Sequence, residues 1–156
     1  MIKHTFVFHI IGLAKKIQKV IGFKSPPFSL SYSEASALLT IDSQKDIHQR
    51  EIASRLHLEP GSVVSLIDKL EKINLVKRES PDGDRRKYHI ILTNIGKRKL
   101  RQIKSRAYQL DNALRNKLSE KEITSFFSTL EKIMAYLDDW KGGENEIPST
   151  KRNLAP

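Results

Sequence analysis

The chain has 156 residues, of which 38% are hydrophobic, and this is enough apolar material for one domain with a continuous core. Lys and Arg outnumber Asp and Glu by 28 to 18, and the net charge of +10 favours a polyanionic partner, either nucleic acid or an anionic membrane surface. The absence of cysteine excludes disulfides, thiolate metal sites, iron–sulfur clusters and sensing through a reactive thiol.

The first predicted element is a helix from Phe6 to Ile21 that ends near Gly22. Its apolar start is similar to the core of a signal peptide, but no small-residue cleavage site follows and the apolar positions continue at helical spacing. The apolar run is also much shorter than the about 20 residues of a membrane-spanning helix. We therefore expect a cytoplasmic protein. Membrane docking of this basic helix is an alternative, but burial of its apolar face in a dimer would compete with it, so no membrane partner is expected.

Two more helices are expected before residue 60. Ser31 and Glu34 have the spacing of a capping box, so a second helix follows them. Asp46 and Gln49 have the same spacing and predict the start of a short third helix, which a tight turn at 57–59 ends.

A fourth helix follows this turn directly. Pro60 occupies its first position, where the missing amide hydrogen has no cost, and Asn74 marks its end because asparagine tolerates the left-handed backbone conformation. The spacing of Val63, Ile67 and Leu70 predicts its buried side. The outer side then consists of Ser62, Val64, Ser65, Asp68 and Lys69.

After the fourth helix the apolar pattern changes to that of strands. Residues 75–78 and 87–92 predict two short strands, and the charged, glycine-containing segment 80–86 predicts the turn between them. The result is a β-hairpin with a charged tip.

Two helices complete the predicted fold. Thr93 can cap a long helix, whose apolar positions from Leu100 to Leu118 have nearly heptad spacing and predict a narrow seam against a partner helix. Ser119 and Glu122 form another capping box, and the stretch from Gly142 to Pro156 has the composition of a disordered tail. The expected buried side of the last helix is Ile123, Phe126, Phe127, Leu130, Ile133, Met134 and Leu137.

This order of elements is the outline of a winged helix-turn-helix, a mainly α fold with a small β-hairpin wing. Small side chains and the positive dipole end at the start of the fourth helix suit entry into a DNA major groove beside a phosphate. The hairpin tip carries Asp84, Arg85 and Arg86, and arginines on such a loop suit a narrow, A/T-rich minor groove. Asp84 would orient one guanidinium through a bidentate pair.

Each of these features also has an ordinary structural interpretation. A charged hairpin tip is usually solvated surface, and a helix with one polar face is usually just amphipathic; their succession in this order is what favours DNA docking. A run of six cations without an acid, between Thr93 and Leu110, either lines a phosphate backbone or offsets acidic groups elsewhere. These cations are Lys97, Arg98, Lys99, Arg101, Lys104 and Arg106.

Several of these segments together resemble the MarR (multiple antibiotic resistance regulator) family over about residues 30 to 138. They are I-A-S-R-L-H-L at 52–58, V-V-S-L-I-D-K-L at 63–70, L-V-K-R at 75–78, D-G-D-R-R at 82–86 and Leu92-Thr93. The most specific part is the spacing from the recognition helix to the Asp-Arg-Arg of the wing and the following Leu-Thr. The resemblance implies a homodimer made by the first and the last two helices, which binds a pseudo-palindromic operator with two recognition helices and two wings.

By position, the resemblance also assigns residues to the DNA contact. Arg86 falls on the minor-groove arginine of the wing and Asp84 on the residue that holds it, while the major-groove and phosphate contacts fall on Ser62, Val64, Ser65 and Lys69. The chain has Val64-Ser65 where many members have a Ser-Arg pair. Val64 would instead touch a thymine methyl, so the operators of relatives cannot simply be transferred. Asn74 replaces the usual glycine after the recognition helix.

The remaining predicted contacts concern phosphates, the dimer and an effector. Arg50, Arg55 and Lys72 are expected to contact phosphates, and the dimer interface to include Ile10, Leu13, Ile17, Leu110, Leu114, Phe127 and Leu130. The resemblance permits, but does not require, a small aromatic acid as effector, between the dimer helices and the winged domain. Tyr32, His48, Arg55 and Arg86 are polar groups that would line such a crevice, although each also suits an ordinary surface role.

No cofactor, metal or catalytic site is expected. The five histidines lack ligand spacing, and the motifs of hydrolases, nucleotide-binding enzymes and zinc proteases are missing from the sequence. The predicted organisation is a dimerisation helix and linker at 1–28, the winged helix-turn-helix at 29–95, dimerisation helices at 96–140 and a disordered tail at 141–156. The predicted function is that of a sequence-specific transcriptional regulator, with repression as the expected outcome. The alternative is a winged helix for protein assembly or non-specific nucleic-acid binding.

Overall fold

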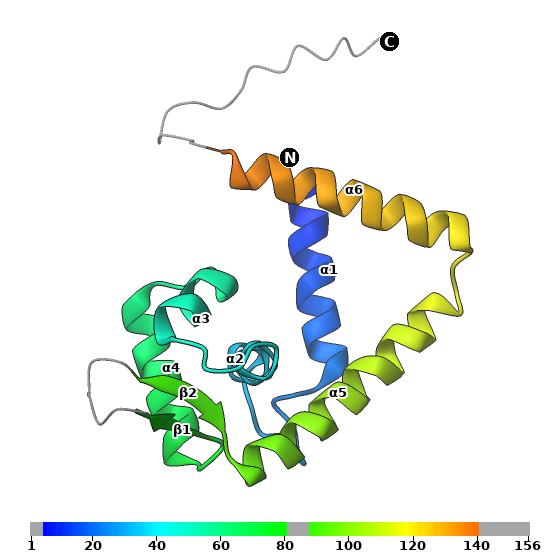
Figure 1. The fold of residues 1–156 in the computed structure, drawn as a ribbon. Helices are drawn as coiled ribbons and strands as arrows, with labels where there is room; N and C mark the ends of the chain where they lie inside the picture. The colour runs from blue at the N-terminus through cyan, green and yellow to red at the C-terminus, as the bar shows by residue number, and fades with distance from the viewer. Residues whose placement is uncertain (1–4, 81–87, 141–156) are drawn as a thin grey trace, which may run out of the picture. The chain divides into compact units, whose positions relative to one another are not determined.

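The computed structural model describes residues 5–80 and 88–140 (Figure 1). The chain divides into two compact units, 1–112 and 113–156. The elements in chain order are α1 (Phe6–Ile21), α2 (Tyr32–Asp42), α3 (Gln49–Leu56), α4 (Pro60–Lys72), β1 (Val76–Glu79), β2 (His89–Leu92), α5 (Asn94–Arg115) and α6 (Glu120–Asp138). The predicted mainly α fold with a small β-hairpin is confirmed.

Local sequence signals set the ends of several helices. The amide of Glu34 donates to Ser31 Oγ at 3.2 Å and the amide of Ser31 donates to Glu34 Oε2 at 2.7 Å, which completes the predicted capping box of α2. The box of Ser119 and Glu122 at the start of α6 is confirmed in the same way. Gly22 ends α1 with a φ of 72°, in the left-handed region that favours glycine.

The start of α3 differs from the prediction. The helix begins at Gln49, and the amide of His48 donates to Glu51 Oε2 at 2.8 Å. Asp46 has a φ of 57° and lies before the helix, so the predicted pairing of Asp46 with Gln49 was wrong. The reason is tertiary: Ile47 pairs with Ile90 as an isolated β-bridge, which keeps this part of the chain extended.

The fourth helix agrees with the sequence pattern. Pro60 is at its first turn, and Val63, Ile67 and Leu70 are buried, together with Leu66. Asn74 follows the helix with a φ of 57°, which confirms the left-handed turn expected there. This turn directs the chain into β1.

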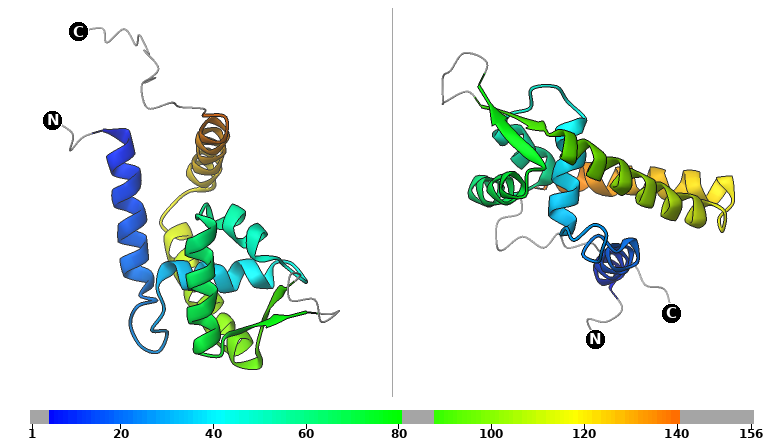
Figure 2. Two further views of the ribbon diagram at one scale, coloured as in Figure 1. Left: turned by 90° about the vertical axis from the view of Figure 1, so that its left-hand side faces the viewer. Right: turned by 90° about the horizontal axis from the view of Figure 1, so that it is seen from below.

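The wing sheet is small and lies at the edge of the first unit (Figure 2). β1 and β2 are antiparallel, with Val76 opposite Leu92 and Glu79 opposite His89. The amide of Ile90 also donates to the carbonyl of Ile47 at 2.9 Å, so the segment before α3 is attached to the outer edge of β2. The predicted strands started one or two residues too early.

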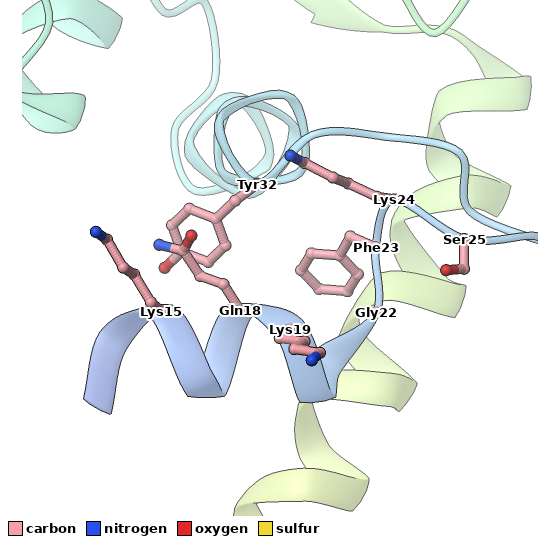
Figure 3. Close-up of a pocket in the computed structure, with 8 residues that line it drawn as sticks. All are labelled: Lys15, Gln18, Lys19, Gly22, Phe23, Lys24, Ser25 and Tyr32. Carbon is pink, nitrogen blue, oxygen red and sulfur yellow. The ribbon is translucent and has the colours of Figure 1, made fainter. Parts of the chain in front are cut away.

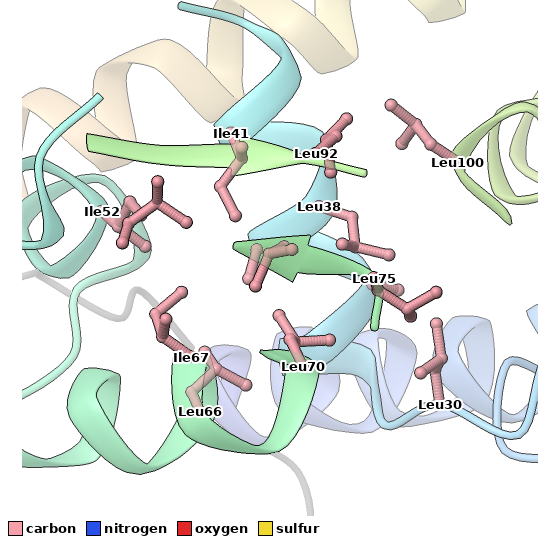
Figure 4. Packing of buried hydrophobic residues seen from close by; sticks show 14 of the residues in the cluster. Leu30, Leu38, Ile41, Ile52, Leu66, Ile67, Leu70, Leu75, Leu92 and Leu100 are labelled. Carbon is pink, nitrogen blue, oxygen red and sulfur yellow. The ribbon is translucent and has the colours of Figure 1, made fainter. Parts of the chain in front are cut away.

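The core of the first unit gathers side chains from α2, α3, α4, the two strands and the start of α5 (Figure 4). α2 lies at its centre, seen end-on in Figure 1, and contacts α3, α4 and β2. Its residues Ala35, Ala37 and Leu38 are fully buried. This packing fixes α3 and α4 against the base of the wing.

The predicted seam of α5 has two parts. Leu100 and Ile103 are buried in the core of the first unit, and Leu110 packs partly against the same core. Leu114 is 48% exposed, and Leu118 lies beyond Arg115, where the helix ends. The expectation of one continuous seam for a partner helix was therefore wrong for its first half, because the chain's own core occupies it.

Among the described residues, exposed large apolar side chains are most numerous in α1 and α6. In α1 these are Phe6, Val7, Phe8, Ile10, Ile11, Leu13, Ile17 and Val20, and in α6 they are Phe126, Phe127, Leu130, Met134, Tyr136 and Leu137. Of the side chains expected to be buried in α6, the single chain buries only Ile123, with Ile133 half-buried.

Candidate nucleic-acid interface

The outer face of α4 has the composition expected of a recognition helix. Ser62, Val64, Ser65 and Lys69 are all exposed, whereas the apolar side of the same helix is in the core. An added side-chain carbon at Gly61 would meet no atom within 4 Å, so the first turn is open to solvent. Small side chains at this end allow close approach of a helix to the floor of a major groove.

Two acidic side chains of α4 are held by one arginine from the wing. The Arg78 guanidinium in β1 donates from Nη2 to Asp68 Oδ1 at 2.6 Å and from Nη1 to Glu71 Oε2. The backbone amide of Arg78 also donates to Glu71 Oε1 at 3.0 Å. Three hydrogen bonds therefore join β1 to α4.

The ion pairs also fix the charge at this junction. Partial burial by itself would lower the pKa of the Arg78 guanidinium, but the carboxylates of Asp68 and Glu71 outweigh this effect and raise its pKa. Arg78 therefore stays cationic, and the two carboxylates are compensated. Without this compensation, the phosphates that border a DNA groove would repel the two carboxylates.

The start of α5 is attached to the turn that precedes β1. The Thr93 amide donates to the carbonyl of Leu75 at 3.1 Å, and Thr93 Oγ1 donates to the carbonyl of Asn74 at 2.6 Å. The amide of Gly96 donates to Thr93 Oγ1 at 3.0 Å, which confirms the predicted cap of α5. This gives the Leu92-Thr93 motif a structural role: it attaches α5 to the turn between α4 and β1.

The predicted wing-tip residues Asp84, Arg85 and Arg86 lie outside the described residues. Their place in the chain is between the ends of β1 and β2, whose register is described. Their contacts with DNA stay a prediction.

The predicted phosphate contacts fall into two groups. Arg50 in α3 and Lys72 at the end of α4 are exposed. Arg55 instead donates from Nη1 to Ser43 Oγ at 2.9 Å and from Nη2 to Gln44 Oε1, so it connects α3 to the end of α2. A phosphate would have to share Arg55 with these partners.

Three of the six cations in the basic run of α5 make contacts within the chain. Lys99 donates to the carbonyl of Pro27 at 2.7 Å, and Lys104 pairs with Asp42 at 2.6 Å. Arg106 donates to the carbonyls of Val20 and Ile21 at 3.1 and 3.2 Å, where it satisfies the C-terminal end of α1. The contacts of these three residues favour the second of the two interpretations of the run, an internal role.

One contact at the wing base had no signal in the sequence. His48 and His89 are 41 positions apart in sequence, yet their rings lie 4.5 Å apart, centroid to centroid. His48 Nδ1 lies 2.9 Å from the carbonyl of Tyr88, and His89 Nδ1 lies 2.8 Å from the carbonyl of Asp46. The pair joins the segment before α3 to β2, beside the Ile47–Ile90 bridge.

A separate pocket of about 350 Å³ lies between the end of α1, the segment 22–25 and the start of α2 (Figure 3). Its described lining carries three ammonium groups and no carboxylate, with two aromatic rings. The lining includes Lys15, Gln18, Lys19, Phe23, Lys24 and Tyr32. Tyr32 is the one residue of the expected effector crevice found here; His48 and Arg55 lie elsewhere, and Arg86 is outside the described residues.

Other kinds of site find no support in the described ranges. Among residues 5–80 and 88–140, no three His, Asp or Glu side chains are grouped so that they could hold a metal ion. In the same ranges no helix combines the length and apolar character needed to cross a membrane.

Known proteins share both the sequence pattern and this architecture. The MarR family model matches residues 30–88. The chain is 21% identical to the HTH-type transcriptional regulator MgrA of Staphylococcus aureus, over 90% of this chain and 95% of that protein.

Solved structures agree with the fold. The S. aureus MepR–DNA complex has a TM-score of 0.76 at 21% identity and covers 86% of this chain and 98% of MepR. CouR from Rhodococcus jostii RHA1, bound to p-coumaroyl-CoA, has a TM-score of 0.72 at 23% identity and covers 85% of this chain and 94% of CouR. The resemblance inferred from the sequence is confirmed: residues 30–88 match the MarR family model, and the fold is shared with the solved MepR structure.

Proposed function

We propose that the chain is a sequence-specific DNA-binding transcriptional regulator, a repressor that acts as a homodimer on a pseudo-palindromic operator. The observation that carries this proposal is the junction of α4 with the wing. Arg78 holds Asp68 and Glu71, so the exposed face of α4 and the base of the hairpin form one connected surface. Such a surface suits a recognition helix in the major groove with a wing over the neighbouring minor groove.

The relatives support the same function. MgrA is a transcriptional regulator by name, and the structure of MepR contains DNA. The net charge of +10 would support binding to a polyanion. Because DNA is the proposed partner, we expect the chain to act in the cytoplasm.

The exposed apolar faces of α1 and α6 support a homodimer. Phe6, Ile10 and Leu13 in α1 are 41–64% exposed, and Phe127 and Leu130 in α6 are 45% and 37% exposed. Large apolar side chains gathered on one helix face are typical of interaction sites. A second copy that covers these helices would also set the distance between the two recognition helices.

We further propose that an aromatic acid binds in the pocket beside α1 and relieves DNA binding. Three lysines, Lys15, Lys19 and Lys24, suit an anionic group, and the rings of Phe23 and Tyr32 suit an aromatic body. Ligand-bound relatives such as CouR support a ligand-responsive role. Benzoate-type acids should raise the unfolding midpoint of the wild type and reduce its affinity for DNA. Lys19→Met should weaken both effects, whereas Lys121→Met in α6 should change neither.

The test of the DNA-binding function is selection of bound duplexes from a random library with the purified protein, followed by affinity against salt. We expect an inverted repeat and a steep fall of log affinity with log salt, because several phosphates release counterions. Enrichment of no sequence, or an affinity that hardly changes with salt, would contradict the proposal. The first outcome would favour non-specific binding, and the second would favour the protein-assembly alternative.

A further inference from the structure

The recognition helix carries few groups that can read a base edge by paired hydrogen bonds. Residues 60–72, all of them described, include no Arg, Asn or Gln; the side chains there that can bind guanine O6 and N7 are Lys69 and Lys72. The carboxylates of Asp68 and Glu71 are engaged by Arg78. Ser65 Oγ lies 3.4 Å from the carbonyl of Gly61, in a contact within the helix.

The same face presents one branched apolar side chain to solvent. Val63 and Val64 are neighbours in sequence, yet Val63 is fully buried and Val64 is 43% exposed. Side chains in a helix lean toward its N-terminus, so the methyl groups of Val64 cover the surface over Gly61, one turn earlier. Gly61 has no side chain, and a Cβ atom added there would have open space around it, so position 61 itself does not shield Val64.

The major groove has one apolar feature that can match such a group. The C5-methyl of thymine projects into the groove, and aliphatic side chains contact it, whereas cytosine and uracil carry hydrogen there. We infer that Val64 determines specificity by contact with a thymine methyl in each operator half-site. This inference rests on the proposed DNA-binding function.

The size of the effect follows from the burial of a single methyl group. Loss of one such contact should reduce affinity about fourfold per half-site, and loss of both contacts in a symmetric operator about 15-fold. A change of this size is measurable by fluorescence anisotropy with labelled duplexes.

The experiment replaces each thymine of the selected operator by deoxyuridine, one symmetric pair at a time, which removes only the methyl group. Wild type, Val64→Ala and Val64→Ile are titrated with every duplex. We expect one thymine position where the wild type loses about 15-fold, Val64→Ala loses less than twofold, and Val64→Ile responds like the wild type. Val64 is exposed, so these variants keep the core unchanged.

The outcomes separate the inference from the function on which it rests. If the wild type binds the operator specifically but Val64→Ala and wild type respond equally at every position, the inference is overturned and the DNA-binding function stands. If the wild type binds the selected and a scrambled duplex equally, the sequence-specific function itself fails, and the inference fails with it.

Discussion

The Arg78 guanidinium of β1 donates a hydrogen bond of 2.6 Å to the Asp68 carboxylate of α4. The same guanidinium engages Glu71 one turn further along α4. The wing is thereby attached to the recognition helix through side chains that are 10 and 7 residues apart in sequence. In the proposed complex, α4 binds the major groove and the wing binds the neighbouring minor groove, so the position of the wing relative to α4 has to be fixed. Mutation of Arg78 tests this directly.

Replacement of Arg78 by Met should lower both stability and DNA affinity. It would remove the ion pairs and leave Asp68 and Glu71 without their partner, and we expect the free energy of unfolding in urea to fall by about 1–2 kcal/mol. Lys77→Met is the matched control, because Lys77 is exposed in the same strand and pairs with Glu79 at the surface. Its effect on stability should stay below about 0.5 kcal/mol. Equal losses in the two variants would show that the junction has no special role.

Gly96 should not tolerate a side chain. A Cβ atom at this position would lie 1.9 Å from the carbonyl oxygen of Leu75, which is backbone and cannot move aside cheaply. Gly96→Ala should therefore destabilise the first unit by about 1–3 kcal/mol, measured by urea unfolding. Gly12→Ala in α1 is the control, since it meets no atom within 4 Å and should stabilise its helix by up to about 1 kcal/mol. A neutral Gly96→Ala would mean that α5 does not pack closely on the turn before β1.

The dimer is best tested in α6. Leu110 packs partly against the core of its own chain, so a charge there would confound dissociation with unfolding. Leu130→Asp places a charge on the exposed apolar face and should convert the dimer to a monomer in sedimentation velocity. Ser128→Asp adds the same charge two residues earlier, on the opposite side of the helix, and should leave the dimer intact. A Leu130→Asp variant that remains dimeric would remove α6 from the interface.

The capping carboxylate of α3 predicts a pH dependence of stability. Hydrogen bonds from the His48 amide and the Gln44 side chain lower the pKa of Glu51 below its ordinary value of 4.5. Glu51 therefore contributes stability above pH 4.5, and this contribution is lost as the pH falls through the lower, folded-state pKa. In Glu51→Gln the unfolding free energy should fall less steeply between about pH 5 and 3 than in the wild type. If the unfolding free energies of the wild type and Glu51→Gln change with pH in parallel, this carboxylate has no such role.

The wing arginine gives a prediction from the sequence. Arg86→Ala should weaken binding, with the main loss on operators whose flanks are A/T-rich, because narrow minor grooves attract arginine. The measurement is affinity for the selected operator with A/T-rich or G/C-rich flanks. Unchanged affinity on both duplexes would exclude a contact by the wing tip.

Local sequence patterns predicted the elements well, because their causes are local. The spacing of Val63, Ile67 and Leu70 identified the buried side of α4, and Ser31 and Ser119 marked helix starts through contacts three residues away. The start of α3 was predicted wrongly because the bridge between Ile47 and Ile90 outweighs the local capping pattern. Tertiary pairing of this kind leaves no periodic trace in the sequence.

The sequence predicted which residues of the candidate site are exposed, but it did not predict the contacts between their side chains. The exposure of Ser62, Val64 and Ser65 followed from helical periodicity. The bond between Arg78 and Asp68 and the contact between the rings of His48 and His89 depend on how the two strands pack against α4 and the segment before α3. Single positions in a sequence do not encode such packing. The seam of α5 was misjudged for a related reason, because heptad spacing looks the same whether the partner surface belongs to the same chain or to another.

The most direct test of the account changes the spacing of the two half-sites in the selected operator. A homodimer presents two recognition helices about one helical turn of DNA apart, so five inserted base pairs would place the second half-site on the opposite side of the duplex. We predict that this insertion lowers affinity to that of a duplex with a single half-site. Unchanged affinity after the insertion would contradict a dimer that reads both half-sites together.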